Sequence, residues 1–298
     1  MKLHSIRSIA LATFVFAAVS ANAQIIFSNN PDPGDFFTSP STSGATQAIG
    51  ATGWFYNNVR NNAVVGINTN NPRSGNGSVY FSGTQTGAFS HKADIEYFQF
   101  ASPGNPTSGL AAMGTLGALN SLSYDWYRDS SSTADSHLHP SLRLYIDADG
   151  NMGTTTDRGY LIFEGIYNGQ AAAPTDAWQT SDIFNWNGAG QSANMWLRQF
   201  SPGQTNEVYD RSIQDWIAGQ STAGFLQLSG QSAIYGLSAG IGSGWGPFEG
   251  AVDNISIGFT GGTFNTYNFE AAPVPEPGTM AVLGLGALAM IRKRRKSS

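Results

Sequence analysis

Apolar and polar residues alternate along much of the chain between residues 24 and 272. In residues 141–148, the apolar Leu142, Leu144 and Ile146 are each separated by one polar or aromatic residue. Side chains of a β-strand point to opposite faces in turn, so a period of two is typical of a strand with one buried face. The pattern predicts such a strand over 141–148.

Similar short segments, bounded by turn residues, predict further strands. They cover residues 77–81, 93–100, 121–127, 159–167, 193–200, 233–241 and 251–259. One short helix is predicted at 212–218, where Ser212 and Asp215 have the spacing of a capping box. Helical patterns are otherwise scarce. Residues 24–272 are therefore expected to form one all-β domain, an antiparallel β-sandwich.

Two strands allow an assignment of faces. In 233–241, Tyr235 is in phase with Leu237, and the opposite face is mostly small, with Ser238 between glycines. In 251–259, Asp253 is in phase with the apolar residues. A carboxylate on an apolar face must be paired or solvated. We expect Asp253 at the solvated end of its strand; the alternative is that it helps to hold a calcium ion or anchors a loop.

The N-terminus has the pattern of a secretory signal peptide over residues 1–23. Two basic residues precede the apolar stretch Ser8–Ser20. The small residues Ala21 and Ala23 then give the small-x-small pattern of a cleavage site between Ala23 and Gln24. We expect signal peptidase to cut between these two residues. The alternative is a buried first helix, which the polar turn residues that follow disfavour.

The C-terminus combines three features. Pro275, Glu276 and Pro277 precede the uncharged stretch 279–291, and a basic run follows it. The run consists of Arg292, Lys293, Arg294, Arg295 and Lys296. As a helix, the uncharged stretch would span about 20 Å, so it needs local thinning of a hydrocarbon core of about 30 Å. The basic run is expected to anchor the end in the cytoplasm, with the body outside.

This order over residues 273–298 resembles the PEP-CTERM sorting signal of Gram-negative bacteria. The resemblance implies that an exosortase, a membrane cysteine transpeptidase, recognises Pro275, Glu276 and Pro277 and removes the tail. The chain would then be held only transiently in the inner membrane by its transmembrane segment 279–291. The alternative is a permanent C-terminal membrane anchor.

The body is similar to jelly-roll domains of the concanavalin-like type. The phrases that carry this resemblance are residues 122–127, 140–146 and 251–258. The resemblance implies a β-sandwich and favours carbohydrate recognition, although a fold alone does not define a function.

Charge and composition exclude several classes of function. All 20 Asp and Glu residues lie between Asp32 and Glu276, where only 8 of the 15 Lys and Arg residues are found, for a net charge of −12. Such a body repels phosphate backbones, which excludes nucleic acid as a partner. The chain has no cysteine, which excludes disulfides, thiolate nucleophiles and cysteine-based zinc sites.

Two motifs suggest chemistry that their context disfavours. Residues 236–240 match the GxSxG pattern of a nucleophile elbow, but the last histidine, His139, lies upstream, and the surroundings indicate a strand. His137 and His139 have the spacing of two metal ligands on one face of a strand. We expect a solvated loop there instead.

Asp147, Asp149 and Asn151 could bind calcium, because hard oxygen ligands alternate along the chain. The segment is not an EF-hand, since its glycine falls at the fourth position and Arg158 occupies the twelfth. A β-turn explains it equally well. No other cofactor is predicted.

No catalytic residue is predicted. Glycoside hydrolysis requires two carboxyl groups across a cleft. Asp94 and Glu96 have the reverse order of the concanavalin-like pattern Glu-x-Asp-x-x-Glu and lack its third acid, and Glu164 and Glu249 are isolated in the sequence.

Three tryptophans, Trp178, Trp186 and Trp245, lie in segments rich in Gly, Asn and Asp. Their rings are expected to be exposed and could stack on the C–H face of a sugar. The sequence therefore predicts an exported, non-enzymatic protein of the cell surface or extracellular matrix, associated with exopolysaccharide or biofilm. The alternatives are a carbohydrate-active enzyme, either a glycoside hydrolase or a lyase, and a permanently membrane-anchored structural protein.

Overall fold

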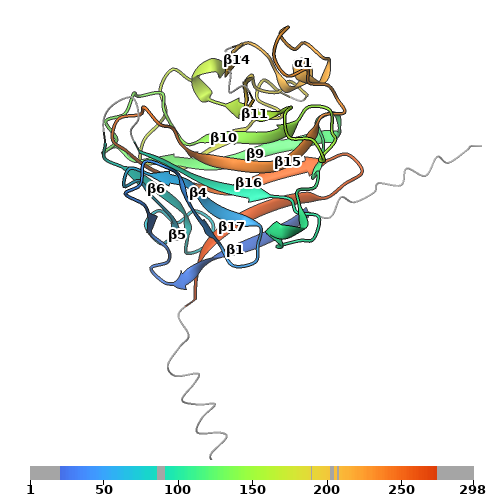
Figure 1. Cartoon of the computed structure of the whole chain (residues 1–298). Helices are drawn as coiled ribbons and strands as arrows, with labels where there is room; N and C mark the ends of the chain where they lie inside the picture. The colour runs from blue at the N-terminus through green and yellow to red at the C-terminus, as the bar shows by residue number, and fades with distance from the viewer. Residues whose placement is uncertain (1–20, 86–90, 189, 202–204, 207, 274–298) are drawn as a thin grey trace, which may run out of the picture.

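The computed structural model describes residues 21–85, 91–188, 190–201, 205–206 and 208–273. In this part of the chain, two β-sheets pack face to face, and Figure 1 shows the strands as two layers. The described part contains one α-helix, α1 (Ile213–Ile217), and three short 3₁₀ turns. The turns are η1 (Pro106–Ser108), η2 (Leu116–Ala118) and η3 (Gly165–Asn168).

The eight-stranded sheet has the order β1-β17-β16-β6-β5-β2, with β9 beside β16 and β12 beside β9. Its strands are β1 (Ala21–Pro31), β2 (Phe37–Thr38), β5 (Val64–Asn68), β6 (Ser78–Gly83), β9 (Leu119–Arg128), β12 (Gln179–Asp182), β16 (Phe248–Phe259) and β17 (Phe264–Ala272). All pairs are antiparallel except β1 with β17. This parallel pair brings the first and last strands of the described body side by side, with Ala21 and Ala272 at opposite ends of the pair (Figure 1).

The nine-stranded sheet has the order β14-β13-β11-β10-β15-β7-β4-β3, with β8 beside β15. Its strands are β3 (Ala45–Ala48), β4 (Trp54–Arg60), β7 (Lys92–Phe98), β8 (Gly114–Thr115), β10 (Ser141–Asp147), β11 (Arg158–Phe163), β13 (Met195–Gln199), β14 (Thr205–Asn206) and β15 (Ala233–Ile241). Three pairs of neighbours are consecutive along the chain, namely β3 with β4, β10 with β11 and β13 with β14. The other neighbours are separated by further strands along the chain, which is the arrangement of a sandwich with crossover connections. The predicted all-β sandwich is confirmed.

Alternation explains the core between the two sheets. Leu142, Leu144 and Ile146 of β10 are fully buried in it, as predicted. On the facing sheet, Tyr124 and Trp126 of β9 point into the same core. The outward side chains of the nine-stranded sheet are thereby left to form a surface of their own. Helix α1 begins with the predicted capping box of Ser212 and Asp215.

Two β-bulges correct the predicted faces. In β15, Gly236 pairs with Tyr145 and Ile234 pairs with Ile146, so Tyr235 is an extra residue. The bulge turns Tyr235 to the outer face, where its ring lies 5.4 Å from that of Tyr145, and turns Ile234 into the core. The prediction that Tyr235 shares the face of Leu237 is therefore wrong.

The second bulge lies in β16 at Asn254, which has a φ of 48°. Val252 and Ile255, on either side of it, both point into the core. Asp253 consequently does not share the face of Ile255, and it is fully buried rather than at a solvated strand end, which corrects both expectations.

The predicted processing sites lie at the ends of this body. Ala23 and Gln24 are in β1, opposite Thr266 and Tyr267 of β17. The described residues contain no helix that is long and apolar enough to cross a membrane. The predicted segment 279–291, Pro275, Glu276, Pro277, the basic run and residues 1–20 lie outside the described residues.

Candidate functional site

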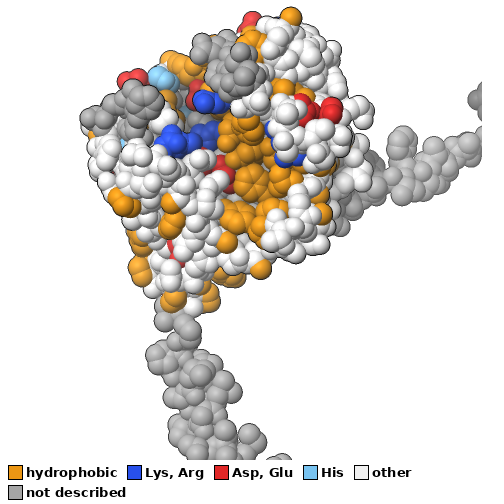
Figure 2. Space-filling model, in the orientation of Figure 1, with side chains coloured by type: hydrophobic (Ala, Val, Ile, Leu, Met, Phe, Trp, Pro, Cys, Tyr) orange, Lys and Arg blue, Asp and Glu red, His pale blue; other side chains and the backbone are white. Residues whose placement is uncertain are grey.

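The outer face of the nine-stranded sheet carries a hollow of about 440 Å³, which we call the groove. Its aromatic lining residues are Tyr160, Trp196, Phe200 and Trp245. Its charged lining residues are Arg60, Lys92, Arg143, Glu164 and Arg198. Asn58, Ile162, Gly242 and Ser243 complete it. Figure 2 shows this face, with Lys and Arg side chains beside a continuous hydrophobic patch in the hollow.

The central strand β15 leaves room for the groove because its outward residues beyond Tyr235 are small. They are Gly236, Ser238 and Gly240. A Cβ atom on Gly240 would lie 2.2 Å from Oδ1 of Asp94, so only glycine allows that carboxylate to lie over the strand. The GxSxG segment is thus the floor of the groove, within a strand, and not a nucleophile elbow.

Two cations share one carboxylate on this floor. Oδ2 of Asp94 lies 2.7 Å from Nζ of Lys92, and Oδ1 lies 2.8 Å from Nη1 of Arg143. Burial opposes ionisation of Asp94, but the charges of Lys92 and Arg143 outweigh it and hold its pKa below the usual value. Asp94 is therefore a charged, fully paired group.

Glu96 lies two residues further along the same face of β7 and is fully buried. It accepts hydrogen bonds from the side-chain amides of Asn57 and Asn58 and from Oγ of Ser238 at 3.3 Å. Burial, and then the negative charge of Asp94, raise the pKa of Glu96. We call Lys92, Asp94, Glu96 and Arg143 the groove cluster.

An aromatic patch continues the groove over β10, β11 and β13. The ring of Tyr160 lies 4.6 Å from those of Tyr145 and Phe200, and Tyr145 lies 4.8 Å from Phe98. The hydroxyl of Tyr160 donates to that of Tyr145 at 3.1 Å. Phe200 is 39% exposed, so this patch presents ring surface to solvent.

Of the predicted ligand-binding tryptophans, the structure brings only Trp245 to the groove, where it is nearly buried and packs against Phe248 at 5.3 Å. Trp186 is half-buried against Phe163, and its Nε1 donates to the carbonyl oxygen of Asn168. Trp178 is half-buried beside Tyr127 and outside the groove lining.

Sequence reasoning missed Trp196, a half-buried residue that lines the groove. The signal was present in the predicted strand 193–200. Met195 and Leu197 are fully buried, so alternation assigns Trp196, Arg198 and Phe200 to the outer face.

The candidate calcium ligands lie at one end of the β10–β11 hairpin. Carboxylate oxygens of Asp147, Asp149 and Asp157 lie within 4.8 Å of one another, while Oδ1 of Asn151 accepts from the backbone N–H of Gly153. Arg158 forms an ion pair with Asp147 at 3.0 Å. The calcium site stays a prediction, with Asp157 as a further oxygen donor.

The two histidines considered as metal ligands differ. His139 is buried, and its ring stacks on Trp126 at 4.1 Å. Burial lowers its pKa to about 4. The expectation of a solvated loop is therefore wrong for His139, which is buried. His137 is half-buried.

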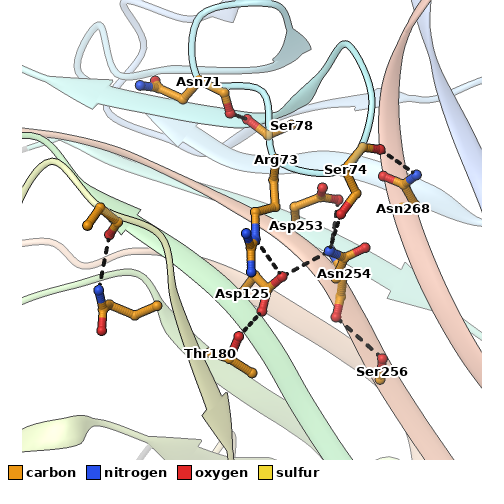
Figure 3. A network of polar contacts seen from close by, with 12 residues as sticks. Asn71, Arg73, Ser74, Ser78, Asp125, Thr180, Asp253, Asn254, Ser256 and Asn268 are labelled. Atoms are coloured by element: carbon orange, nitrogen blue, oxygen red, sulfur yellow. Dashed lines mark hydrogen bonds and ion pairs between the residues drawn. The ribbon is translucent and has the colours of Figure 1, made fainter.

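A second polar cluster lies on the outer face of the eight-stranded sheet (Figure 3). Asp125 of β9 and Asp253 of β16 are cross-strand neighbours. Asp125 accepts from Arg73 at 3.0 Å, from Thr180 at 2.6 Å and from the amide of Asn254 at 2.9 Å. We call Arg73, Asp125, Thr180, Asp253 and Asn254 the loop cluster, because Arg73 belongs to the loop between β5 and β6.

Asp253 is satisfied in a different way. Its Oδ1 accepts from the backbone N–H groups of Asn254 at 2.8 Å and Phe269 at 3.0 Å. Its Oδ2 is buried and has no hydrogen-bond partner among the described residues. Burial raises the pKa of Asp253 to about 7, although the two N–H groups act in the opposite direction.

The fold and the groove define a β-sandwich with a hollow on the outer face of one sheet. Residues 273–296 match the PEP-CTERM protein-sorting motif, which confirms the resemblance of the C-terminus to that signal. The motif marks the chain as an exported protein of the type that exosortases process in Gram-negative bacteria.

The chain was also compared with curated proteins and with solved structures, and these comparisons give less information than the sorting motif does. No curated protein matches the chain. Among solved structures, it is similar to the family 11 carbohydrate-binding module from Clostridium thermocellum in complex with a β-1,3-1,4-mixed-linked tetrasaccharide. That match has 12% identity and a TM-score of 0.34, and it covers 73% of this chain and 88% of the other.

Proposed function

We propose that the protein is an extracellular carbohydrate-binding protein whose groove holds a polysaccharide of the cell surface or biofilm matrix. The observation that carries this proposal is that ring surface and polar side chains line one groove: the half-buried Trp196 and the exposed Phe200, together with Asn58 and Arg198. Aromatic rings pack against the C–H faces of sugars, while amide and guanidinium groups can bind their oxygens.

A binding role is favoured over catalysis by the state of the carboxylates. Asp94 is 1% exposed and Glu96 fully buried, and both are occupied by hydrogen bonds or ion pairs. Glu164 is the one carboxylate among the described lining residues. A glycosidase needs two carboxyl groups that reach the substrate. Release of reducing ends from a bound polysaccharide would instead support the carbohydrate-active enzyme.

The test uses the secreted protein, purified from its Gram-negative host through an affinity tag inserted before Val274. The host exopolysaccharide is titrated while tryptophan fluorescence and pull-down are measured. Trp196→Ala is expected to weaken binding about tenfold or more, because one aromatic stacking contact is lost. Trp178→Ala, a half-buried tryptophan outside the groove, is the matched control. Equal binding by both variants and the wild type would remove the groove from the proposal.

Export is proposed to proceed through signal peptidase cleavage after Ala23, transient retention in the inner membrane and removal of the tail by an exosortase. The intact mass of the secreted protein tests these steps. A mass that lacks residues 1–23 and the run from Arg292 to Lys296 is expected. Persistence of the basic run would favour a permanently anchored protein.

A further inference from the structure

The cations of the body gather in the groove. Between Asp32 and Glu276 the chain has 8 Lys and Arg residues against 20 acids. Four of those basic residues, Arg60, Lys92, Arg143 and Arg198, line this one hollow. The concentration is opposite in sign to the rest of the body, so a negatively charged polymer that the surface repels would be attracted here.

The cations are not cancelled by neighbouring acids. Lys92 and Arg143 share the single carboxylate of Asp94. Within the part of the chain that the structure describes, no carboxylate forms an ion pair with Arg60 or Arg198. Glu164 also lines the groove, and burial raises its pKa although Arg143 acts in the opposite direction. Glu96 of the groove cluster also acts on Lys92 and Arg143, so the four cations face at most three carboxylates, and the positive charges exceed the negative ones.

The geometry of β13 combines this charge with ring surface. Trp196, Arg198 and Phe200 alternate on the outer face, and Arg198 pairs across the strands with Tyr160. Arg198 is exposed, while Arg60 is half-buried on β4, across the sheet from β13. A guanidinium group binds a carboxylate through two parallel hydrogen bonds, and a ring beside it can take the sugar face.

We propose that the groove selects acidic polysaccharides and that Arg60 and Arg198 bind the carboxylates of their uronic acid units. This inference rests on the proposed carbohydrate-binding function and names the class of ligand. The paired cations Lys92 and Arg143 keep the floor of the groove in place and add to its positive potential.

The test compares one polymer in its charged and its esterified form, with a neutral polymer of another backbone as a further reference. Polygalacturonate, the same polymer after methyl esterification, and neutral dextran are titrated against the tagged secreted protein. We expect polygalacturonate to bind about tenfold or more tightly than its ester, because esterification removes the carboxylate charge. Raising the NaCl concentration from 50 to 300 mM should lower the ratio of the affinity for polygalacturonate to the affinity for its ester, since salt screens exposed charges.

Variants assign the effect to residues. Arg60→Gln with Arg198→Gln should weaken binding of polygalacturonate more than binding of the ester, so that the ratio of the two affinities falls to about one. Arg73→Gln, which removes a partly exposed arginine outside the groove, should bind as the wild type does. Circular dichroism spectra confirm that each variant is folded.

The outcomes separate the two proposals. Equal binding of polygalacturonate, ester and dextran, lost in Trp196→Ala, would overturn acid selection and leave carbohydrate binding intact. Dextran sulfate bound as well as polygalacturonate would also overturn it, since the contact would then be general ion exchange. If neither these polymers nor the host exopolysaccharide bind, both proposals are wrong.

Discussion

The groove cluster and the loop cluster place the same kind of group in different surroundings. Each has two buried or nearly buried carboxylates on the outer face of a sheet. In the groove cluster, Asp94 is paired with two cations, Lys92 and Arg143. In the loop cluster, Asp253 has only backbone N–H groups as donors. Cations keep the first carboxylate charged, whereas the pKa of the second rises to about 7.

This difference also separates their roles. The groove cluster lies beneath an open hollow that Arg60 and Arg198 also line, and neither arginine forms an ion pair within the described residues. The loop cluster joins β9, β12, β16 and the loop that carries Arg73, and these hydrogen bonds connect parts of the protein to one another (Figure 3). A buried carboxylate is thus evidence for a binding site only where unpaired groups and a cavity accompany it.

The largest contrast is expected from removing one arginine from each cluster. Arg143→Met should lower the free energy of unfolding by about 3 kcal/mol, because it breaks a buried ion pair with Asp94. The loss is not larger because Lys92 still pairs with Asp94. Arg73→Met should cost less than about 1 kcal/mol, since the side chain of Arg73 is 38% exposed. Urea unfolding measures both. Equal losses would contradict the distinction between the clusters.

A smaller effect, which depends on pH, is expected at Asp253. Its pKa of about 7 lies above the ordinary value of 3.8, so between these values the folded state holds a proton that the unfolded state has released. The contribution of Asp253 to stability is complete below about pH 4 and is lost as the pH rises through 7. Between pH 5.5 and 7, the wild type should lose about 2 kcal/mol relative to Asp253→Asn, at roughly 1.4 kcal/mol per pKa unit.

Thermal and urea unfolding of the wild type and Asp253→Asn across this range measure the difference. Asn keeps the oxygen that accepts from Phe269 and places an amide where Oδ2 has no partner. Asp125→Asn, which replaces the other carboxylate of the loop cluster, is the control. A difference between wild type and Asp253→Asn that does not change with pH would show that Asp253 is ionised in the folded protein.

The sequence was sufficient for the strands with a strict period of two. Leu142, Leu144 and Ile146 are buried as their spacing predicts, because β10 is regular throughout. The alternation pattern assigned Tyr235 and Asp253 to the wrong face, because one extra residue in a β-bulge reverses the faces of a strand. The pattern within one strand does not show where its pairing with the neighbouring strand has such an extra residue. The strands that were not predicted are β1, β2, β3, β4, β5, β8, β12, β14 and β17.

The groove could be predicted only in part. The small face of β15 around Ser238 was visible as a pattern, and so was the alternation that turns Trp196 outward. The presence of Arg60 and Arg198 in one groove could not be predicted, because β4 and β13 are far apart in sequence and their order in the sheet follows from pairing that no local pattern encodes. Choosing tryptophans by their loop surroundings led to Trp178 and Trp186, which the structure places outside the groove lining.

The smallest effect that distinguishes the clusters is expected from a pair of hydroxyl groups that donate to carboxylates. Ser238 is fully buried and bonds Glu96, and Thr180 is exposed and bonds Asp125. Ser238→Ala should cost about 1 to 2 kcal/mol, because a buried acceptor loses a donor that water cannot replace. Thr180→Val should cost less than about 1 kcal/mol, since Asp125 keeps its bonds from Arg73 and Asn254. If urea unfolding gave the larger loss for Thr180→Val, the loop cluster rather than the groove cluster would be the one that depends on its internal bonds.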